Sequence, residues 1–115
     1  MHEISIVNSI IKTLEIEFEK EKLNRMKAIH LKVGMLSNIE PRLLHNAYSA
    51  YNLTNPKYHH VQLHIESTDI KIQCELCNHI TQIQRYKFQC ENCKRPSKNI
   101  IQGEEMLIHK VEFED

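Results

Sequence analysis

The sequence is poor in glycine, proline and tryptophan, and it has no excess of either charge. Two glycines, three prolines and no tryptophan occur among 115 residues, and fifteen Lys and Arg balance fifteen Asp and Glu. The scarcity of glycine excludes a glycine-rich phosphate-binding loop. The zero net charge argues against a polyanion-binding surface spread over the whole molecule. No apolar run approaches the roughly 18 to 20 residues that cross a bilayer.

The amino terminus also lacks the pattern of a secretory signal. Glu3 and Lys12 flank its short apolar stretch, and no small-residue cleavage site follows. We therefore expect a cytoplasmic protein that does not associate with membranes. In that reducing compartment, closely spaced cysteines are more often metal ligands than disulfides.

Hydrophobic periodicity predicts two helices and three strands. Apolar residues at helical spacing predict one helix over about residues 4–22, and a second helix begins at the proline of "SNIEPRLLHNAYSAYNL". Alternation of apolar and polar residues predicts strands over 28–36 and 61–66, the second continuing through Ile70 and Ile72. A third strand is expected in "EEMLIHKVEFED", where neither alternation of apolar residues is clean.

This order of elements predicts an α+β fold. We expect a small three-stranded sheet with two helices on one face, plus an inserted four-cysteine module similar to a zinc ribbon. Residues 1–70 and 99–115 would form an α/β domain, and residues 71–98 a domain inserted into it. Because the last strand has to return to the sheet, the insert is an excursion from the sheet rather than a tail.

The strongest chemical signal is "CELCNHITQIQRYKFQCENC". It contains all four cysteines of the chain as two C-x2-C pairs separated by twelve residues: Cys74, Cys77, Cys90 and Cys93. Each pair can point both thiolates at one ion, and the arm between the pairs can double back to complete a tetrahedron. Four soft ligands with no open position favour a structural Zn²⁺, and an iron–sulfur centre is less favoured at this spacing.

The same block allows two other interpretations. Two redox disulfides are one, although a thioredoxin-like motif has a single C-x-x-C beside a βαβ unit. A zinc-ribbon RNA-binding or protein-interaction adaptor is the other, because Tyr86 and Phe88 interleave with basic residues. The bases, however, offset the negative charge of a zinc–thiolate centre, and we expect both aromatic side chains to fill the small core of the module. Nucleic-acid binding is therefore the disfavoured alternative.

Eight histidines are a high number for this length, and they suit metal binding or sensitivity to pH. His79 could replace a thiolate or hydrogen-bond a ligand, although a solvated loop histidine is favoured. His59 and His60 precede a strand and could bind a metal weakly. Three further histidines fall on predicted strands, where we expect them to face solvent: His30, His64 and His109.

The opening "MHEIS" is the second candidate metal site. The amine of Met1, the main-chain nitrogen of His2 and the imidazole of His2 can join in fused chelate rings, to which Glu3 could add a carboxylate. Such nitrogen-rich ligation favours Ni²⁺ or Cu²⁺ over Zn²⁺, and it requires a free amine on Met1. The plain alternative is that Glu3 complements the helix macrodipole and His2 has no role.

Four motifs carry a resemblance to a known family. They are "MHEIS" before an amphipathic helix, "VGMLSNIEP" after the first strand, the twin C-x2-C pairs, and "GEEM" before the last strand. In this order they resemble the nickel-incorporation protein HypA (HybF) family of hydrogenase maturation, over essentially the whole chain. The sequence departs from that pattern at Met35, where members often have an acid, and it lacks the histidine that some members carry after the last cysteine.

The resemblance implies a nickel metallochaperone that is not an enzyme. Its partners would be the GTPase HypB and the large subunit of [NiFe]-hydrogenase, with urease accessory proteins in some bacteria. By the matching motifs, His2 is the key nickel ligand, Glu3 is a ligand or tuner, and the four cysteines hold zinc. Residues 1–70 and 99–115 would thus be the nickel-binding domain, and residues 71–98 the inserted zinc-binding domain. Zinc would be structural and nickel the transferred cargo, in a monomer or a homodimer.

Overall fold

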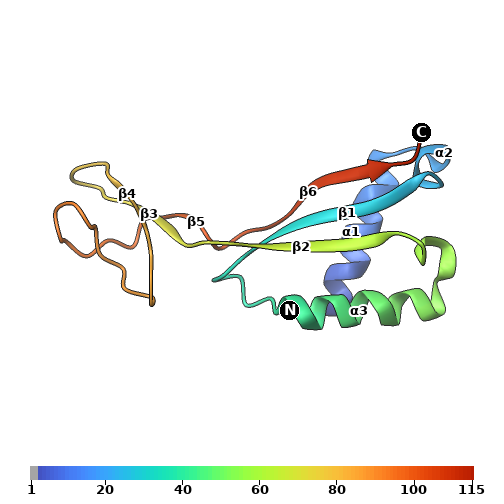
Figure 1. The fold of residues 1–115 in the computed structure, drawn as a ribbon, viewed down its shortest axis with the longest axis horizontal. Coiled ribbons are helices and arrows are strands. Elements are labelled where there is room, and N and C mark those ends of the chain that lie inside the picture. The colour runs from blue at the N-terminus through green and yellow to red at the C-terminus, as the bar shows by residue number, and fades with distance from the viewer. Residues whose placement is uncertain (1–2) are drawn as a thin grey trace.

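The computed structural model describes residues 3–115, which form an elongated molecule of 52 × 27 × 19 Å (Figure 1). It contains two three-stranded sheets, of order β2-β1-β6 and β4-β3-β5. The elements are α1 (Glu3–Glu17), α2 (Lys20–Leu23), β1 (Met26–Gly34), α3 (Pro41–Thr54), the 3-10 turn η1 (Pro56–Tyr58), β2 (Gln62–Thr68), β3 (Lys71–Gln73), β4 (Ile80–Gln82), β5 (Ile100–Gln102) and β6 (Met106–Phe113). Among the described helices, none is long and apolar enough to cross a membrane.

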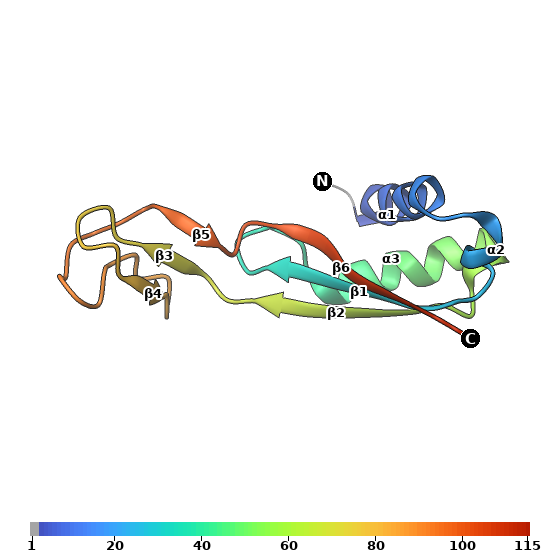
Figure 2. The same cartoon turned by 90° about the horizontal axis from the view of Figure 1, so that it is seen from above.

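The larger sheet and the two long helices form one layered unit. Strands β1 and β2 are parallel, and α3 is the crossover that a parallel pair requires. Strand β6 returns antiparallel to β1 on its other side. Helices α1 and α3 cover the same face of this sheet (Figure 2). The predicted three-stranded sheet with two helices on one face is therefore confirmed.

The core lies between this face and the helices. Its buried side chains follow the helical period in α1 and the two-residue period in β1: Ile6, Val7, Ile10, Ile11 and Leu14 on the helix, and Ile29, Leu31 and Val33 on the strand. Tyr48 of α3 is buried with them, and its hydroxyl donates a hydrogen bond of 2.7 Å to the carbonyl of Val61. This bond ties the middle of α3 to the residue before β2.

The ambiguous alternation in the last strand has a structural cause. Met106 and Ile108 pack against the core, and so do Val111 and Phe113, although the step from Ile108 to Val111 is three residues rather than two. The pairing with β1 shifts at this point, because Leu31 faces Ile108 while the preceding His30 faces Lys110. A β-bulge at His109 therefore changes the alternation so that both halves of β6 face inward.

The predicted continuous helix over residues 4–22 is wrong at its carboxyl end. Helix α1 ends at Glu17, Glu19 is extended, and α2 begins at Lys20. Phe18 packs edge-on against Phe113 of β6, with the ring centroids 5.2 Å apart. A straight helix would place Leu23 well away from the face of Phe18, whereas the bend buries Leu23 as well.

The predicted continuation of the second strand through Ile70 and Ile72 is also wrong. Strand β2 ends at Thr68, and β3 begins at Lys71 in the other sheet. The inward positions change parity between them, from Leu63 in β2 to Ile70 and Ile72. One flat strand cannot bury both sets on the same face, so the chain passes from one sheet to the other.

The only two glycines of the chain meet at the joint between the sheets. A Cβ on Gly34 would lie 2.1 Å from the carbonyl oxygen of Gly103, and Gly103 has φ +122°, a conformation that favours glycine. The same carbonyl accepts a hydrogen bond of 2.7 Å from the Leu36 N–H. The carboxylate of Glu105 accepts hydrogen bonds from the Gly103 N–H at 2.8 Å and the Thr68 hydroxyl at 2.9 Å. Both hydrogen bonds lower the pKa of the Glu105 carboxyl, and the bond from the Gly103 N–H has the largest effect.

We expect Gly34→Ala to lower the free energy of unfolding by about 1 to 3 kcal/mol or more, because the new methyl group overlaps the Gly103 backbone. Urea unfolding followed by circular dichroism measures this. Ser67→Ala, at an exposed position of β2, is the control and should change stability by no more than about 0.5 kcal/mol. Equal stability of the two variants would show that the joint tolerates a side chain.

Candidate metal centre

Each cysteine pair is a tight turn closed by backbone hydrogen bonds. In the first pair, the Asn78 N–H donates to the Cys74 carbonyl and the Cys74 N–H donates to the His79 carbonyl, both at 2.9 Å. Asn78 has φ 61°, which lets the chain turn back immediately after Cys77. The side-chain amide of Gln73 donates to the Asn78 carbonyl at 3.3 Å.

The second pair repeats this geometry. The Lys94 N–H donates to the Cys90 carbonyl and the Cys90 N–H donates to the Arg95 carbonyl, again both at 2.9 Å. Lys94 has φ 66°, and the amide of Gln89 donates to its carbonyl at 2.6 Å. The stretches "QCELCNH" and "QCENCKR" are therefore one turn used twice, which places the two pairs of sulfurs in equivalent ways.

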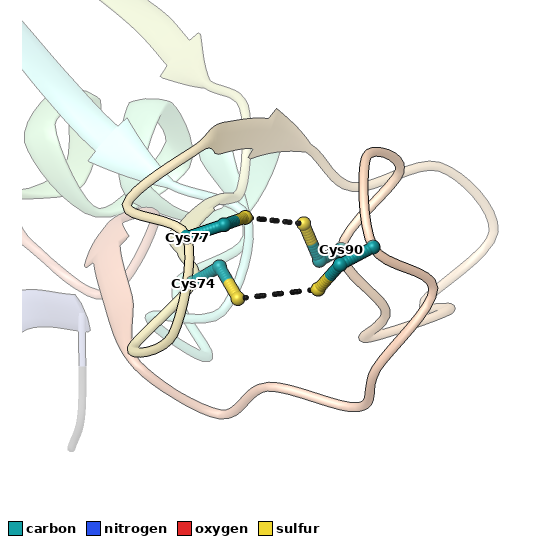
Figure 3. A group of neighbouring side chains, drawn as sticks. Cys74, Cys77 and Cys90 are labelled. Atoms are coloured by element: carbon teal, nitrogen blue, oxygen red, sulfur yellow. Dashed lines mark hydrogen bonds between the residues drawn. The ribbon is translucent and has the colours of Figure 1, made fainter.

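The two turns bring all four sulfurs together, and Figure 3 shows the side chains of Cys74, Cys77 and Cys90 pointing toward one another. The four Sγ atoms all lie within 4.8 Å of one another. The distances from Cys74 to Cys93 and from Cys77 to Cys90 are both 3.6 Å. A zinc ion with Zn–S bonds of about 2.3 Å gives tetrahedral edges of about 3.8 Å, whereas a disulfide needs about 2.05 Å. The sulfurs are spaced for an ion and not for disulfides, and all four cysteines are free.

The turns also aim hydrogen-bond donors at the sulfurs. The backbone N–H groups of Cys77 and Leu76 lower the pKa of Cys74, and those of Cys93 and Asn92 lower the pKa of Cys90. For Cys77 the largest effect comes from the side-chain amide of Asn92, whose Nδ2 lies 3.6 Å from the sulfur. Three of the four sulfurs are therefore stabilised as thiolates, which are the metal-binding form.

The fourth cysteine shows the effect of crowding like charges. The Arg95 backbone N–H acts to lower the pKa of Cys93, but the nearby Cys74 sulfur, burial and the other two sulfurs together raise it to about 11. Without a cation among them, four thiolates at these distances repel one another strongly. A divalent cation removes that repulsion, so the donor set fits a closed zinc site.

His79 bridges the two turns and does not join the cysteines. Its Nε2 lies 2.8 Å from the carboxylate of Glu91, and the Glu91 N–H donates to the buried hydroxyl of Thr81 at 3.1 Å. Within residues 3–115, the cysteines are the only group of three or more His, Cys, Asp and Glu side chains whose ligand atoms converge in this way. His59 and His60 are exposed and lie edge-on, with their ring centroids 5.7 Å apart.

The two aromatic residues of the module differ in their surroundings. Phe88 packs against a small cluster of three buried isoleucines: Ile70, Ile72 and Ile83. Tyr86, by contrast, is 61% exposed and lies in a turn with φ 57°, so the expectation that it fills this core is wrong. The module thus has one aromatic residue and a few isoleucines as its apolar interior.

A family model described as hydrogenase/urease nickel incorporation, metallochaperone, HypA matches residues 1–113. The chain belongs to the HypA family. Both cysteine pairs and the amino-terminal "MHE" lie within the matched range.

Curated HypA relatives match over nearly their full length. The hydrogenase maturation factor HypA of Desulfitobacterium hafniense is 28% identical over 115 residues, which cover 100% of both chains. That of Campylobacter jejuni is 30% identical over 111 residues, covering 96% of this chain and 97% of the relative. The family thus consists of hydrogenase maturation factors.

Solved HypA structures have the same fold. The solution structure of the Ni metallochaperone HypA from Helicobacter pylori matches with a TM-score of 0.67 and 25% identity, covering 98% of this chain and 97% of that one. A second HypA solution structure matches with a TM-score of 0.70 and 26% identity. The α+β architecture with its four-cysteine cluster is therefore that of HypA proteins.

The predicted nickel ligands lie at the very start of the chain. Met1 and His2 fall outside the residues that the structure describes. Glu3 is the first residue of α1 and is half-buried, in the first turn of the helix. The nickel site proposed from the sequence thus stays a prediction.

We expect Asn92→Ala to weaken zinc binding on the order of tenfold, because Cys77 loses the amide that stabilises its thiolate. The substitution keeps the backbone N–H of residue 92, which serves Cys90. Competition with a chromophoric chelator at pH 7 measures the affinity, and Asn8→Ala on the exposed surface of α1 is the control. An unchanged affinity would mean that the side-chain hydrogen bond contributes nothing to the site.

Proposed function

We propose that this chain is a nickel metallochaperone that carries Ni²⁺ at its amino terminus and holds a structural Zn²⁺ on its four cysteines. The observation that carries this proposal is the HypA family match over residues 1–113, which includes both candidate sites. The similarity to a Helicobacter pylori protein described as a Ni metallochaperone supports it further. The protein would act during maturation of a nickel enzyme and would catalyse no reaction of its own.

Zinc is assigned the structural role because its site is closed and its module has a small core. Four thiolates fill a tetrahedron and leave no position for water or substrate. The apolar cluster of the module has three buried isoleucines, which is little for a unit of this size. Metal binding would therefore supply much of the folding free energy of the proposed zinc domain, residues 71–98.

Nickel is assigned the cargo role because its donors can exchange. The terminal amine and the imidazole of His2 have ordinary pKa values of about 7.7 to 8.0 and about 6.5, so protons compete with the metal as pH falls through this range. Glu3 begins α1, whose next inward residues Ile6 and Val7 are each 1% exposed. Its carboxylate therefore belongs to a helix that is fixed to the core of the proposed α/β domain, residues 1–70 and 99–115.

Delivery requires partners, because the described residues contain no nucleotide-binding loop that could supply energy. We assign these roles to the GTPase HypB and to the large subunit of [NiFe]-hydrogenase, with urease and its accessory proteins as the other recipient. The protein would act in the cytoplasm.

The nickel site is tested by changing the terminus alone. We expect His2→Ala, and equally the addition of one residue before Met1, to abolish the tightest Ni²⁺ binding measured by calorimetry, because either change breaks the fused chelate rings. His45→Gln, at an exposed position of α3, should leave that binding unchanged. Tight binding that survives both terminal changes would refute the amino-terminal site.

The zinc role is tested separately. Cys74→Ala should remove zinc and unfold the proposed zinc domain with β3 and β4, and the pairing of β3 with β5 should be lost with it. The amide NMR signals of β1, β2 and β6 should persist, because the larger sheet has its own core. Ni²⁺ binding by His2 should also persist. A variant that keeps its module folded without metal would contradict the structural role of zinc.

A further inference from the structure

The face of the larger sheet opposite the helices carries two stacked imidazoles. His30 of β1 and His64 of β2 occupy facing positions of the parallel pair. Their ring centroids lie 4.7 Å apart with an interplanar angle of 17°. Because Ile29 and Leu31 point toward the helices, His30 between them points the other way, and its side chain is 24% exposed. His64 is exposed. Neither residue belongs to the cysteine cluster or to the chain terminus.

A carboxylate from the third strand completes this group. Nε2 of His30 is hydrogen-bonded to Oε1 of Glu112, which lies on β6. This contact, more than the neighbouring Lys110, lowers the pKa of Glu112, so the carboxylate is charged at neutral pH. Each strand of the sheet thus contributes one potential ligand to the same surface.

The surface around these residues contains further donors. A shallow hollow beside the stacked pair is lined by His109 and Glu66, and the next hollow by His60 and Glu114. Lysines also line these hollows, namely Lys110 in the first and Lys27 in the second. The carboxylates balance these positive charges, so the surface does not repel a cation as a whole.

Two imidazoles and a carboxylate are a donor set for divalent transition metals such as Ni²⁺ and Zn²⁺. An ion that replaced the proton shared by His30 and Glu112 would be coordinated by both side chains. His64 lies against the His30 ring and is open to solvent, so it can turn about its side-chain bonds to supply a third donor. That turn is required, since in the described chain only the four cysteines already converge.

We propose that His30, His64 and Glu112 form a third, solvent-exposed binding site for a divalent transition-metal ion on the open face of the sheet. Three ligands leave the remaining coordination positions to water, so the ion exchanges freely. The site is separate from the zinc cluster, and it does not depend on the proposed role of the amino terminus.

The test uses the full chain with one equivalent of zinc bound and with His2→Ala, which removes the proposed terminal nickel ligand. We expect Ni²⁺ titration by calorimetry to show one remaining binding event. His30→Gln and His64→Gln should each weaken it about tenfold or more, because a nitrogen donor is lost. His45→Gln is the matched control on the helical side and should have no effect.

The location of the ion is checked without further substitution. Paramagnetic Ni²⁺ should broaden the imidazole NMR signals of His30 and His64 before those of His45. The proposal would be overturned if both glutamine variants bound Ni²⁺ as tightly as the parent His2→Ala chain, if broadening were confined to other histidines, or if no binding were seen at all. Loss of the terminal site alone leaves these results unchanged, so the two proposals fail independently.

Discussion

The mutual repulsion of four thiolates within 4.8 Å of one another is the constraint on which the second half of the molecule depends. Two copies of one turn place the sulfurs and point N–H groups at them, yet the pKa of Cys93 is still raised to about 11. The surrounding unit has only a small apolar cluster, which includes Ile72 at 0% exposure. The geometry of the turns fits a bound cation, which would offset the repulsion and, under the proposed function, stabilise the module.

The position of the cysteine module relative to the larger sheet is set by a close contact between two glycines. Gly34 ends β1, and a Cβ there would overlap the backbone of Gly103, which precedes β6. Gly103 itself has φ +122°, and a Cβ there would meet Ile70 at 3.0 Å. Glu105 fixes the same place by accepting hydrogen bonds from Gly103 and Thr68. The motifs "VGMLSNIEP" and "GEEM", which are far apart in sequence, are thus two sides of one joint. Leu36, within the first motif, packs on the apolar cluster of the cysteine module, so the joint belongs to both units.

Histidine has three different roles on this chain. His79 makes a hydrogen bond with Glu91 between the cysteine turns, His2 is the proposed cargo ligand, and His30 stacks on His64 across two strands. These histidines differ in role because different groups surround each imidazole ring. His30 lies beside His64 because β1 pairs with β2, and the spacing of the two histidines along the chain does not predict this contact.

The sequence by itself determined the features whose interactions are local. The cysteine cluster follows from two short spacings, and α3 and β1 follow from periodic apolar residues that begin and end within one element. Only the tertiary structure decided the division of the predicted second strand, the bulge at His109, the second sheet and the meeting of His30 with Glu112. The division of the second strand had a signal in the sequence, because the apolar positions change from odd to even numbers before Ile70. A continuous strand cannot bury both sets on one face. Strands of three residues, such as β4 and β5, are too short to show a period, and β5 pairs with β3, which is distant from it in sequence.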